Sequence, residues 1–290
     1  MIELLALGSA VFYGSADFYG GLTARRANTI ATVVVTQFVG LVLLLVVLPF
    51  LPATAVSPRD WLWGIGAGLS GGVGVALLYR ALAVGTMAVV APVTAVCAAI
   101  IPVLFALALG ERLRLLTIAG IALALVAIAL VSQQPTAPDP NGNRRPRRGL
   151  PPGLCLAILS GVAVGIFFLS LARTSSAAGM WPLIAARVTS ITLFGLIAVI
   201  TGRTLRMSAP AATTAIAGGA LDMVANALYM IAARVGPLSI VVTLASLYPA
   251  ATVLLARVVL GERLSVVQGL GIGCALAAVV IIVATTGQPN

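Results

Sequence analysis

Residues 109–113 and 260–264 have the same sequence, Leu-Gly-Glu-Arg-Leu. The two copies lie 151 positions apart, and they contain two of the seven acidic residues in a chain of 290. Identities continue at this offset on both sides of the pentapeptide, and they include Ser9 with Ser160, Gly85 with Gly236, and Gly120 with Gly271. A gapless offset that carries a charged pentapeptide indicates an internal duplication.

The composition indicates a membrane protein. Hydrophobic residues make up 61% of the chain and charged residues 8%, whereas soluble domains carry about 25% charged residues. Several apolar stretches reach the roughly 20 residues that a helix needs to cross a bilayer, and a helix satisfies its backbone polar groups internally, as lipid requires. The sequence therefore predicts an all-α integral membrane protein with ten transmembrane helices, over residues 3–21, 29–51, 61–83, 87–109, 114–132, 152–173, 180–201, 211–234, 237–260 and 265–285.

A polar stretch rich in proline and arginine, residues 133–149, divides the ten spans into two sets of five. We expect it to be a flexible linker outside the membrane. The predicted domains are a first five-helix repeat at 1–132, this linker, and a second five-helix repeat at 150–290. Because five is odd, the second repeat enters the membrane from the opposite side. Two inverted repeats with a substrate site between them are typical of secondary transporters.

The net charge of +10 does not indicate a protein that binds nucleic acid. All 17 basic residues are arginines, and most lie between apolar runs, where they set membrane topology. The three cysteines lie singly in apolar runs and the chain has no histidine, so we expect no metal and no cofactor. The expected partners are membrane lipid and a small-molecule substrate. The expected location is a cell membrane, of the bacterial plasma membrane type, with the chain as a monomer or a homodimer.

Polar side chains inside the spans are the candidates for function, because they are costly in lipid and usually face the interior of a helix bundle. Asp222, Asn226 and Tyr229 lie on one stripe of the eighth span. Arg187 lies about two turns into the seventh span, by the rise of roughly 1.5 Å per residue. The two spans run antiparallel, so Arg187 and the Asn226 end of this stripe are expected at similar depth.

We expect Asp222 and Arg187 to face a central cavity between the repeats, with Asn226 and Gln37 as neighbours. Burial favours the protonated form of a carboxyl group, whereas a nearby arginine favours the charged form. A carboxylate in such a setting can exchange a proton as the cavity alternates. Arg187 can instead bind a substrate carboxylate, and a purely structural ion pair is the alternative. Asp17, late in the first span, is a further candidate for substrate binding or coupling, or a side chain that reaches the nearby interface.

These features resemble the drug/metabolite transporter superfamily, and in particular its EamA type. The resemblance lies in two five-span halves, and in each half Gly-Glu-Arg-Leu comes directly after the fourth span. The best local match is Tyr248-Pro249 followed by Glu262. Arg187-Val188 matches the arginine–hydrophobic pair that the family often has in its second span, whereas Gln37-Phe38 replaces that pair in the first half. The resemblance implies a transporter but identifies no substrate.

The repeated pentapeptide itself is expected to be a structural motif. The odd number of spans places its two copies on opposite faces of the membrane, each in the turn between the fourth and fifth helices of its repeat. The glycine can end one helix and the last leucine re-enters the apolar layer. The charged pairs, Glu111 with Arg112 and Glu262 with Arg263, then remain at the polar interface.

The function expected from these observations is secondary active transport of a small metabolite, such as an amino acid, or of an amphipathic drug, by alternating access between the repeats. A proton-coupled exporter is one form that this transporter can take. An intramembrane enzyme is disfavoured: residues 68–71 form a Gly-Leu-Ser-Gly string similar to that of rhomboid-type proteases, but that chemistry needs a histidine base. A channel or a lipid scramblase is a third possibility.

Overall fold

The computed structural model describes residues 2–50, 55–108, 115–131, 137–138, 144–145, 151–235, 245, 247–262 and 265–286. The first repeat contains α1 (Ile2–Arg26), α2 (Thr29–Val47), the short helix η1 (Leu48–Phe50), α3 (Pro58–Val84), α4 (Met87–Ala108) and α5 (Leu115–Val131). The second contains α6 (Leu154–Ala172), the short helix η2 (Ser176–Ala178), α7 (Trp181–Ile200), α8 (Ala209–Val235), α10 (Tyr248–Leu260) and α11 (Val266–Thr286). The predicted all-α fold is confirmed.

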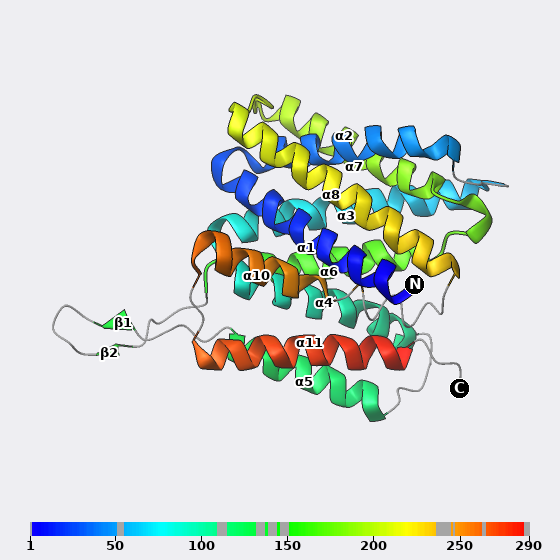
Figure 1. Cartoon of the computed structure of the whole chain (residues 1–290). Coiled ribbons are helices and arrows are strands. Elements are labelled where there is room, and N and C mark those ends of the chain that lie inside the picture. Colours follow the sequence, from blue (N-terminus) through cyan, green and yellow to red (C-terminus); the bar gives the residue numbers. More distant parts are fainter. Residues whose placement is uncertain are drawn as a thin grey trace.

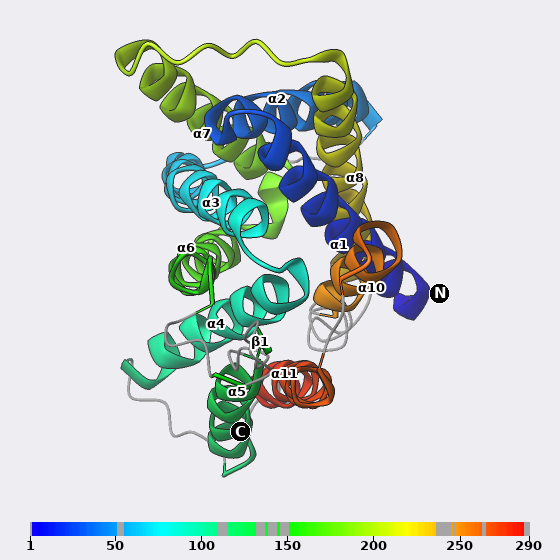
Figure 2. The same ribbon diagram turned by 90° about the vertical axis from the view of Figure 1, so that its left-hand side faces the viewer.

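The helices lie side by side and run alternately in opposite directions, with α1 beginning and α11 ending at the same end of the stack (Figure 1). The two repeats interlock. Helix α1 packs on α8, and its repeat counterpart α6 packs on α3, while α3 contacts α7 and α2 contacts α8. The fifth helices, α5 and α11, pack on each other at one edge (Figure 2). Because the α1–α8 and α2–α8 contacts have counterparts in α6–α3 and α7–α3, the two halves share one interior.

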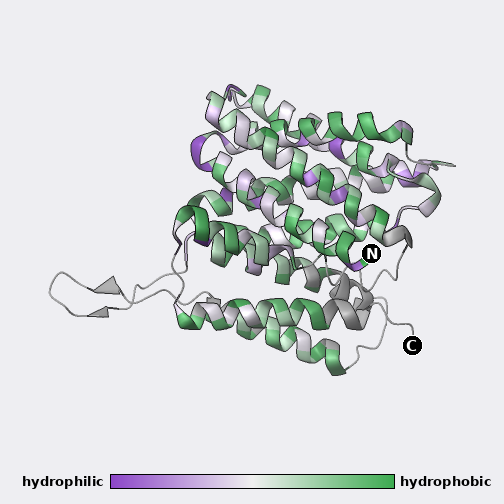
Figure 3. Cartoon of the chain, in the orientation of Figure 1, coloured by the Kyte–Doolittle hydropathy of each residue, from purple (hydrophilic) through white to green (hydrophobic). Residues whose placement is uncertain are grey.

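Five helical segments of the described residues are long and apolar enough to cross a membrane: Thr29–Phe50, Pro58–Val84, Leu154–Leu171, Trp181–Ile200 and Ala209–Tyr229. Helix α1 is long, but it is not among them. It packs against α3, α8 and α10 and carries Tyr13 and Asp17, so it is a more polar, interior helix. Hydrophilic residues within the helices are few, and they lie mainly where α1, α2, α7 and α8 meet (Figure 3).

Glycine allows α3 to approach α7 closely. A Cβ atom added at Gly64 would lie 2.7 Å from the Pro182 carbonyl oxygen, and one added at Gly68 would lie 2.5 Å from that of Ala186. Both obstacles are backbone atoms that cannot rotate away. The two glycines lie one turn apart, so they form a face on which the backbone of α7 rests, as in other closely packed membrane helices.

We expect Gly68→Ala to destabilise the protein by about 1–3 kcal/mol, because the added methyl group must push α3 and α7 apart. Gly269→Ala in α11 is the matched control, since among the described residues no atom outside its own helix backbone and chain neighbours lies within 4 Å of the position of its added Cβ. Alanine is the better helix former by about 1 kcal/mol, so this control is expected to be neutral or stabilising. Thermal melts of the two purified variants in detergent check the pair. Equal melting temperatures would contradict the close contact.

The N-terminus of α3 is fixed by a capping box. The Ser57 Oγ accepts a hydrogen bond from the Asp60 backbone N–H at 3.2 Å, and the Asp60 carboxylate accepts one from the Ser57 N–H at 2.9 Å. The other carboxylate oxygen of Asp60 accepts a hydrogen bond from the Ser175 N–H at 2.7 Å. Asp60 therefore joins the start of α3 to the segment after α6, which belongs to the second repeat.

Two predicted segments differ in the structure. The ninth span was expected as one helix from 237 to 260, but the described helix, α10, begins at Tyr248 with Pro249 in its first turn. Proline is favoured there because a first-turn residue has no intrahelical partner for an N–H. Residues 236–244 and 246 lie outside the described residues. Within the predicted linker, β1 (Ala137–Pro138) and β2 (Arg144–Arg145) pair antiparallel and project beyond the helices (Figure 1).

Candidate functional site

An arginine-centred cluster lies where α2, α7 and α8 meet. The Arg187 Nη1 donates a hydrogen bond to the Gln37 side-chain oxygen of α2. The Arg187 Nη2 donates to a carboxylate oxygen of Asp222 on α8 and forms an ion pair with it. Helix α2 belongs to the first repeat, and α7 and α8 belong to the second. The cluster therefore joins the two repeats through charged and polar groups in the apolar layer.

Asn226 supports Asp222 from the next turn of α8. Its Nδ2 donates to the backbone oxygen of Asp222 at 2.7 Å and to a carboxylate oxygen at 3.3 Å. The sequence predicted that Arg187 would reach the Asn226 end of the stripe, whereas Arg187 contacts Asp222 itself. Tyr229, on the same stripe, packs against the apolar cluster of Ala6 and Ala232. Tyr229 therefore makes no hydrogen bond to the arginine in the described structure.

The members of the cluster differ in exposure. The Arg187 side chain is 9% exposed and the Asp222 side chain is 26% exposed, while Gln37 and Asn226 are buried. The Arg187 Nε is buried without a hydrogen-bond partner in the described structure. The carboxylate of the pair is thus less covered by the protein than the guanidinium.

Two glycines that the sequence did not single out allow close packing at the cluster, and one of them makes room for the arginine. A Cβ atom added at Gly40, one turn beyond Gln37, would lie 3.2 Å from the guanidinium carbon of Arg187. A Cβ added at Gly219, one turn before Asp222, would lie 2.5 Å from the Thr36 carbonyl oxygen. Helix α8 therefore rests on the backbone of α2 beside the cluster. Since the chain has 30 glycines, no pattern in the sequence distinguishes these two.

Asp17 lies apart from the ion pair but within electrostatic range of Asp222. It is partly buried in the middle of α1, one turn after Tyr13. Within the described part of the chain, its carboxylate has neither a hydrogen-bond donor nor an ion-pair partner. Whether it serves substrate binding or reaches the interface stays a prediction.

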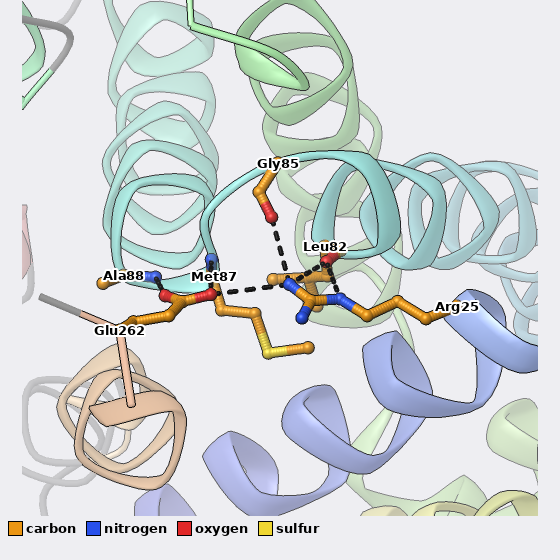
Figure 4. Close-up of polar contacts among 6 residues, drawn as sticks. All are labelled: Arg25, Leu82, Gly85, Met87, Ala88 and Glu262. Carbon is orange, nitrogen blue, oxygen red and sulfur yellow. Dashed lines mark hydrogen bonds and ion pairs between the residues drawn. The ribbon is translucent and has the colours of Figure 1, made fainter. Parts of the chain in front are cut away.

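Glu262 of the second pentapeptide has a specific structural role at one end of the stack (Figure 4). Its carboxylate oxygens accept hydrogen bonds from the backbone N–H groups of Met87 and Ala88, each at 3.1 Å, so Glu262 caps the N-terminus of α4. Arg25 lies 3.4 Å from the same carboxylate and also donates to the Leu82 carbonyl oxygen, near the end of α3. The motif therefore joins α10 to the first repeat.

The other three charged residues of the two pentapeptides, Glu111, Arg112 and Arg263, lie outside the described residues. The helices that precede the two motifs, α4 and α10, end at opposite ends of the stack (Figure 1).

Comparison with known proteins agrees with this architecture. The model of the EamA-like transporter family matches the chain twice, at residues 1–133 and 151–284. This protein belongs to the EamA-like transporter family. A crystal structure of a protein that shares 16% sequence identity superposes with a TM-score of 0.55, covering 94% of this chain and 95% of the other, which shows a similar fold.

An uncharacterized protein of Methanocaldococcus jannaschii is 31% identical over 130 residues, which are 44% of this chain and 94% of that protein. This relative is thus about as long as one repeat of the EamA-like chain. Its length agrees with the duplication that the repeated pentapeptide indicates.

EamA-like proteins are transporters, and the serine of the Gly-Leu-Ser-Gly string has a structural contact in this member. The Ser70 Oγ donates to the Gly66 carbonyl oxygen of its own helix at 2.9 Å. Such a bond to the preceding turn is usual for serine in membrane helices.

Proposed function

We propose that this EamA-like protein is a secondary active transporter in a cell membrane, and that it moves a small metabolite or an amphipathic drug by alternating access between its two repeats. The observation that carries the proposal is the Arg187–Asp222 pair, which lies at the junction of α2, α7 and α8. A charged pair in an apolar layer that contacts both repeats changes its surroundings when one repeat moves against the other. Such a pair is therefore suited to couple binding to this movement.

We infer that the asymmetry of the pair serves proton coupling. The Arg187 side chain is 9% exposed and that of Asp222 is 26% exposed, so the carboxylate is the less covered partner. Protonation would remove the charge that attracts Arg187 and weaken the contact between α7 and α8. A change in this contact would in turn alter how α2 packs against both helices, because Gln37 shares the guanidinium. Movement of a proton and movement of the repeats would thus be linked.

We expect Asp222→Asn to slow transport at least about tenfold and to abolish the dependence of transport on a pH gradient. A tenfold effect corresponds to a coupling energy of about 1.4 kcal/mol. Asparagine keeps the shape of the side chain but cannot ionise. Asp60→Asn, which also removes one carboxylate but outside the cluster, should leave the pH dependence unchanged.

The substrate for this test is first selected by a thermal-shift screen of purified protein against amino acids, other metabolites and amphipathic drugs, because ligands of the folded state raise its melting temperature. Uptake of the selected compound is then measured in proteoliposomes at several pH gradients. Full activity with unchanged pH dependence in both Asp222→Asn and Arg187→Ala would reject a role for the pair in coupling.

A further inference from the structure

Asp17 lies between two places where other helices touch α1. A Cβ atom added at Gly14, one turn before it, would lie 2.2 Å from the Tyr248 carbonyl oxygen at the start of α10. A Cβ added at Gly20, one turn after it, would lie 2.1 Å from the ring of Tyr79 on α3. The hydroxyl of Thr252 also donates to the Gly14 carbonyl oxygen at 2.9 Å. The backbone of α10 and the Tyr79 ring of α3 are therefore packed closely on α1, one turn before and one turn after Asp17.

Three tyrosines come from the same three helices that meet near this carboxylate: Tyr13 lies one turn before Asp17 on α1, the Tyr79 ring lies at Gly20, and the Tyr248 carbonyl oxygen lies at Gly14. Tyr13, Tyr79 and Tyr248 each lie within electrostatic range of Asp17, and they come from α1, α3 and α10. Tyr79 is buried, whereas Tyr13, Tyr248 and Asp17 itself are partly accessible. The chain has only five tyrosines, and three of them lie within electrostatic range of this one acid.

The charges near Asp17 do not balance. Tyr13 and Tyr79 are within electrostatic range of Arg187 as well as of both carboxylates, so the groups belong to one region. The Arg187 charge is already matched by Asp222. Asp17 is then a second carboxylate for which the described residues provide no cation. A carboxylate in an apolar environment is costly unless it is paired or neutralised, and a bound cation would supply the missing partner.

An organic cation fits better than a metal ion. The described residues contain no group of three or more histidine, cysteine, aspartate or glutamate side chains that could bind a metal. Aromatic faces, in contrast, attract ammonium groups, with about 0.5–2 kcal/mol for each well-placed ring. An anion is disfavoured because the guanidinium of Arg187 already donates to Gln37 and Asp222.

We propose that Asp17, with Tyr13, Tyr79 and Tyr248, binds the ammonium group of an organic cation, and that such cations are the substrate class of the transporter. The claim that such cations are transported rests on the proposed function, whereas the claim that they bind does not. The carboxylate supplies the charge, and the tyrosine rings supply a surface that replaces water around the ammonium group. Arg187 and Asp222 then serve coupling rather than charge recognition.

The test uses three probes that share a phenyl ring and differ in charge: benzyltrimethylammonium, benzyl alcohol and phenylacetate. Benzyltrimethylammonium keeps its charge at every pH and donates no hydrogen bond, so it reports charge and ring contacts alone. Binding to the full chain in detergent is measured by isothermal titration calorimetry. We expect the cation to bind at least tenfold more tightly than the other two probes, and Asp17→Asn to weaken its binding about tenfold.

Variants of Tyr248 give a readout that does not depend on Asp17→Asn folding. Tyr248→Phe keeps the aromatic face and should bind the cation as the wild type does, whereas Tyr248→Ala should weaken binding several-fold. Tyr19→Phe is a control, because Tyr19 packs edge-on against Phe18 at 5.7 Å between ring centroids and is not one of the three tyrosines assigned to the site. Tighter binding of phenylacetate, or equal binding of all three probes, would overturn the proposal.

The outcome also separates this proposal from the proposed function. If a compound without a positive charge shows saturable transport that Asp222→Asn abolishes, the transporter stands and the cation site is wrong. If benzyltrimethylammonium binds in an Asp17-dependent manner but no bound cation is transported, the cation site stands and the transport function is wrong.

Discussion

Replacing Arg187 by methionine is expected to abolish transport and to lower the free energy of unfolding by about 3 kcal/mol. Methionine has a similar length but no charge, so Asp222 would remain in the apolar layer without its ion pair. Removing one partner of a buried pair costs about 3–5 kcal/mol, and the lower end applies because Asp222 is 26% exposed. Thermal and chemical denaturation in detergent measure the stability, and proteoliposome uptake measures the transport.

A double variant separates stability from transport. Arg187→Met combined with Asp222→Leu removes both charges, so much of the lost stability should return, because replacing a buried ion pair by apolar residues is often neutral. Transport should not return. Recovery of transport together with stability would show that the pair is only structural, and wild-type behaviour of Arg187→Met alone would show that it is unimportant.

Replacing Glu262 by alanine is expected to destabilise the protein on the order of 2–4 kcal/mol. The backbone N–H groups of Met87 and Ala88 would lose their acceptor. These residues are 0% and 1% exposed, so water cannot readily replace the carboxylate. Each buried donor left without a partner costs about 1–3 kcal/mol. Arg25 would also lose its ion pair.

Glu262→Gln is the matched variant for this change. Glutamine keeps one side-chain oxygen as an acceptor but removes the negative charge that favours a helix N-terminus, so its cost should be intermediate. Denaturation of the two variants in the same detergent checks the order. An equal and small loss, below about 0.5 kcal/mol as for ordinary surface positions, would mean that Glu262 does not stabilise the junction of α4 and α10.

The repeat and the helical fold could be predicted from the sequence because they rest on local features. Apolar runs of sufficient length identify helices, and the pentapeptide identifies the offset of the second repeat. The proximity of Arg187 to Asp222 could also be predicted, because two isolated opposite charges in an apolar layer are expected to pair. Their role in transport stays a prediction.

What the sequence could not predict depends on contacts between distant residues. The partners of Glu262 are two backbone amides and Arg25, and nothing in the pentapeptide indicates which helix start it caps. Gly40 and Gly219 are ordinary members of a glycine-rich chain until the packing of α2 and α8 is known. Pro249 inside the ninth span indicated a possible kink or break, but the start of α10 at Tyr248 could not be located, because an apolar run does not by itself fix a helix boundary.

Counterflow in proteoliposomes tests most directly whether the protein is a carrier whose repeats alternate around the Arg187–Asp222 cluster. Vesicles are loaded with the unlabelled compound selected by the thermal-shift screen, and entry of its labelled form is followed without any imposed ion gradient. We expect saturable entry with a transient overshoot, which unlabelled compound inside the vesicle accelerates and Arg187→Met abolishes. Linear entry that does not saturate, is unaffected by internal compound and persists in Arg187→Met would contradict a carrier and indicate a channel.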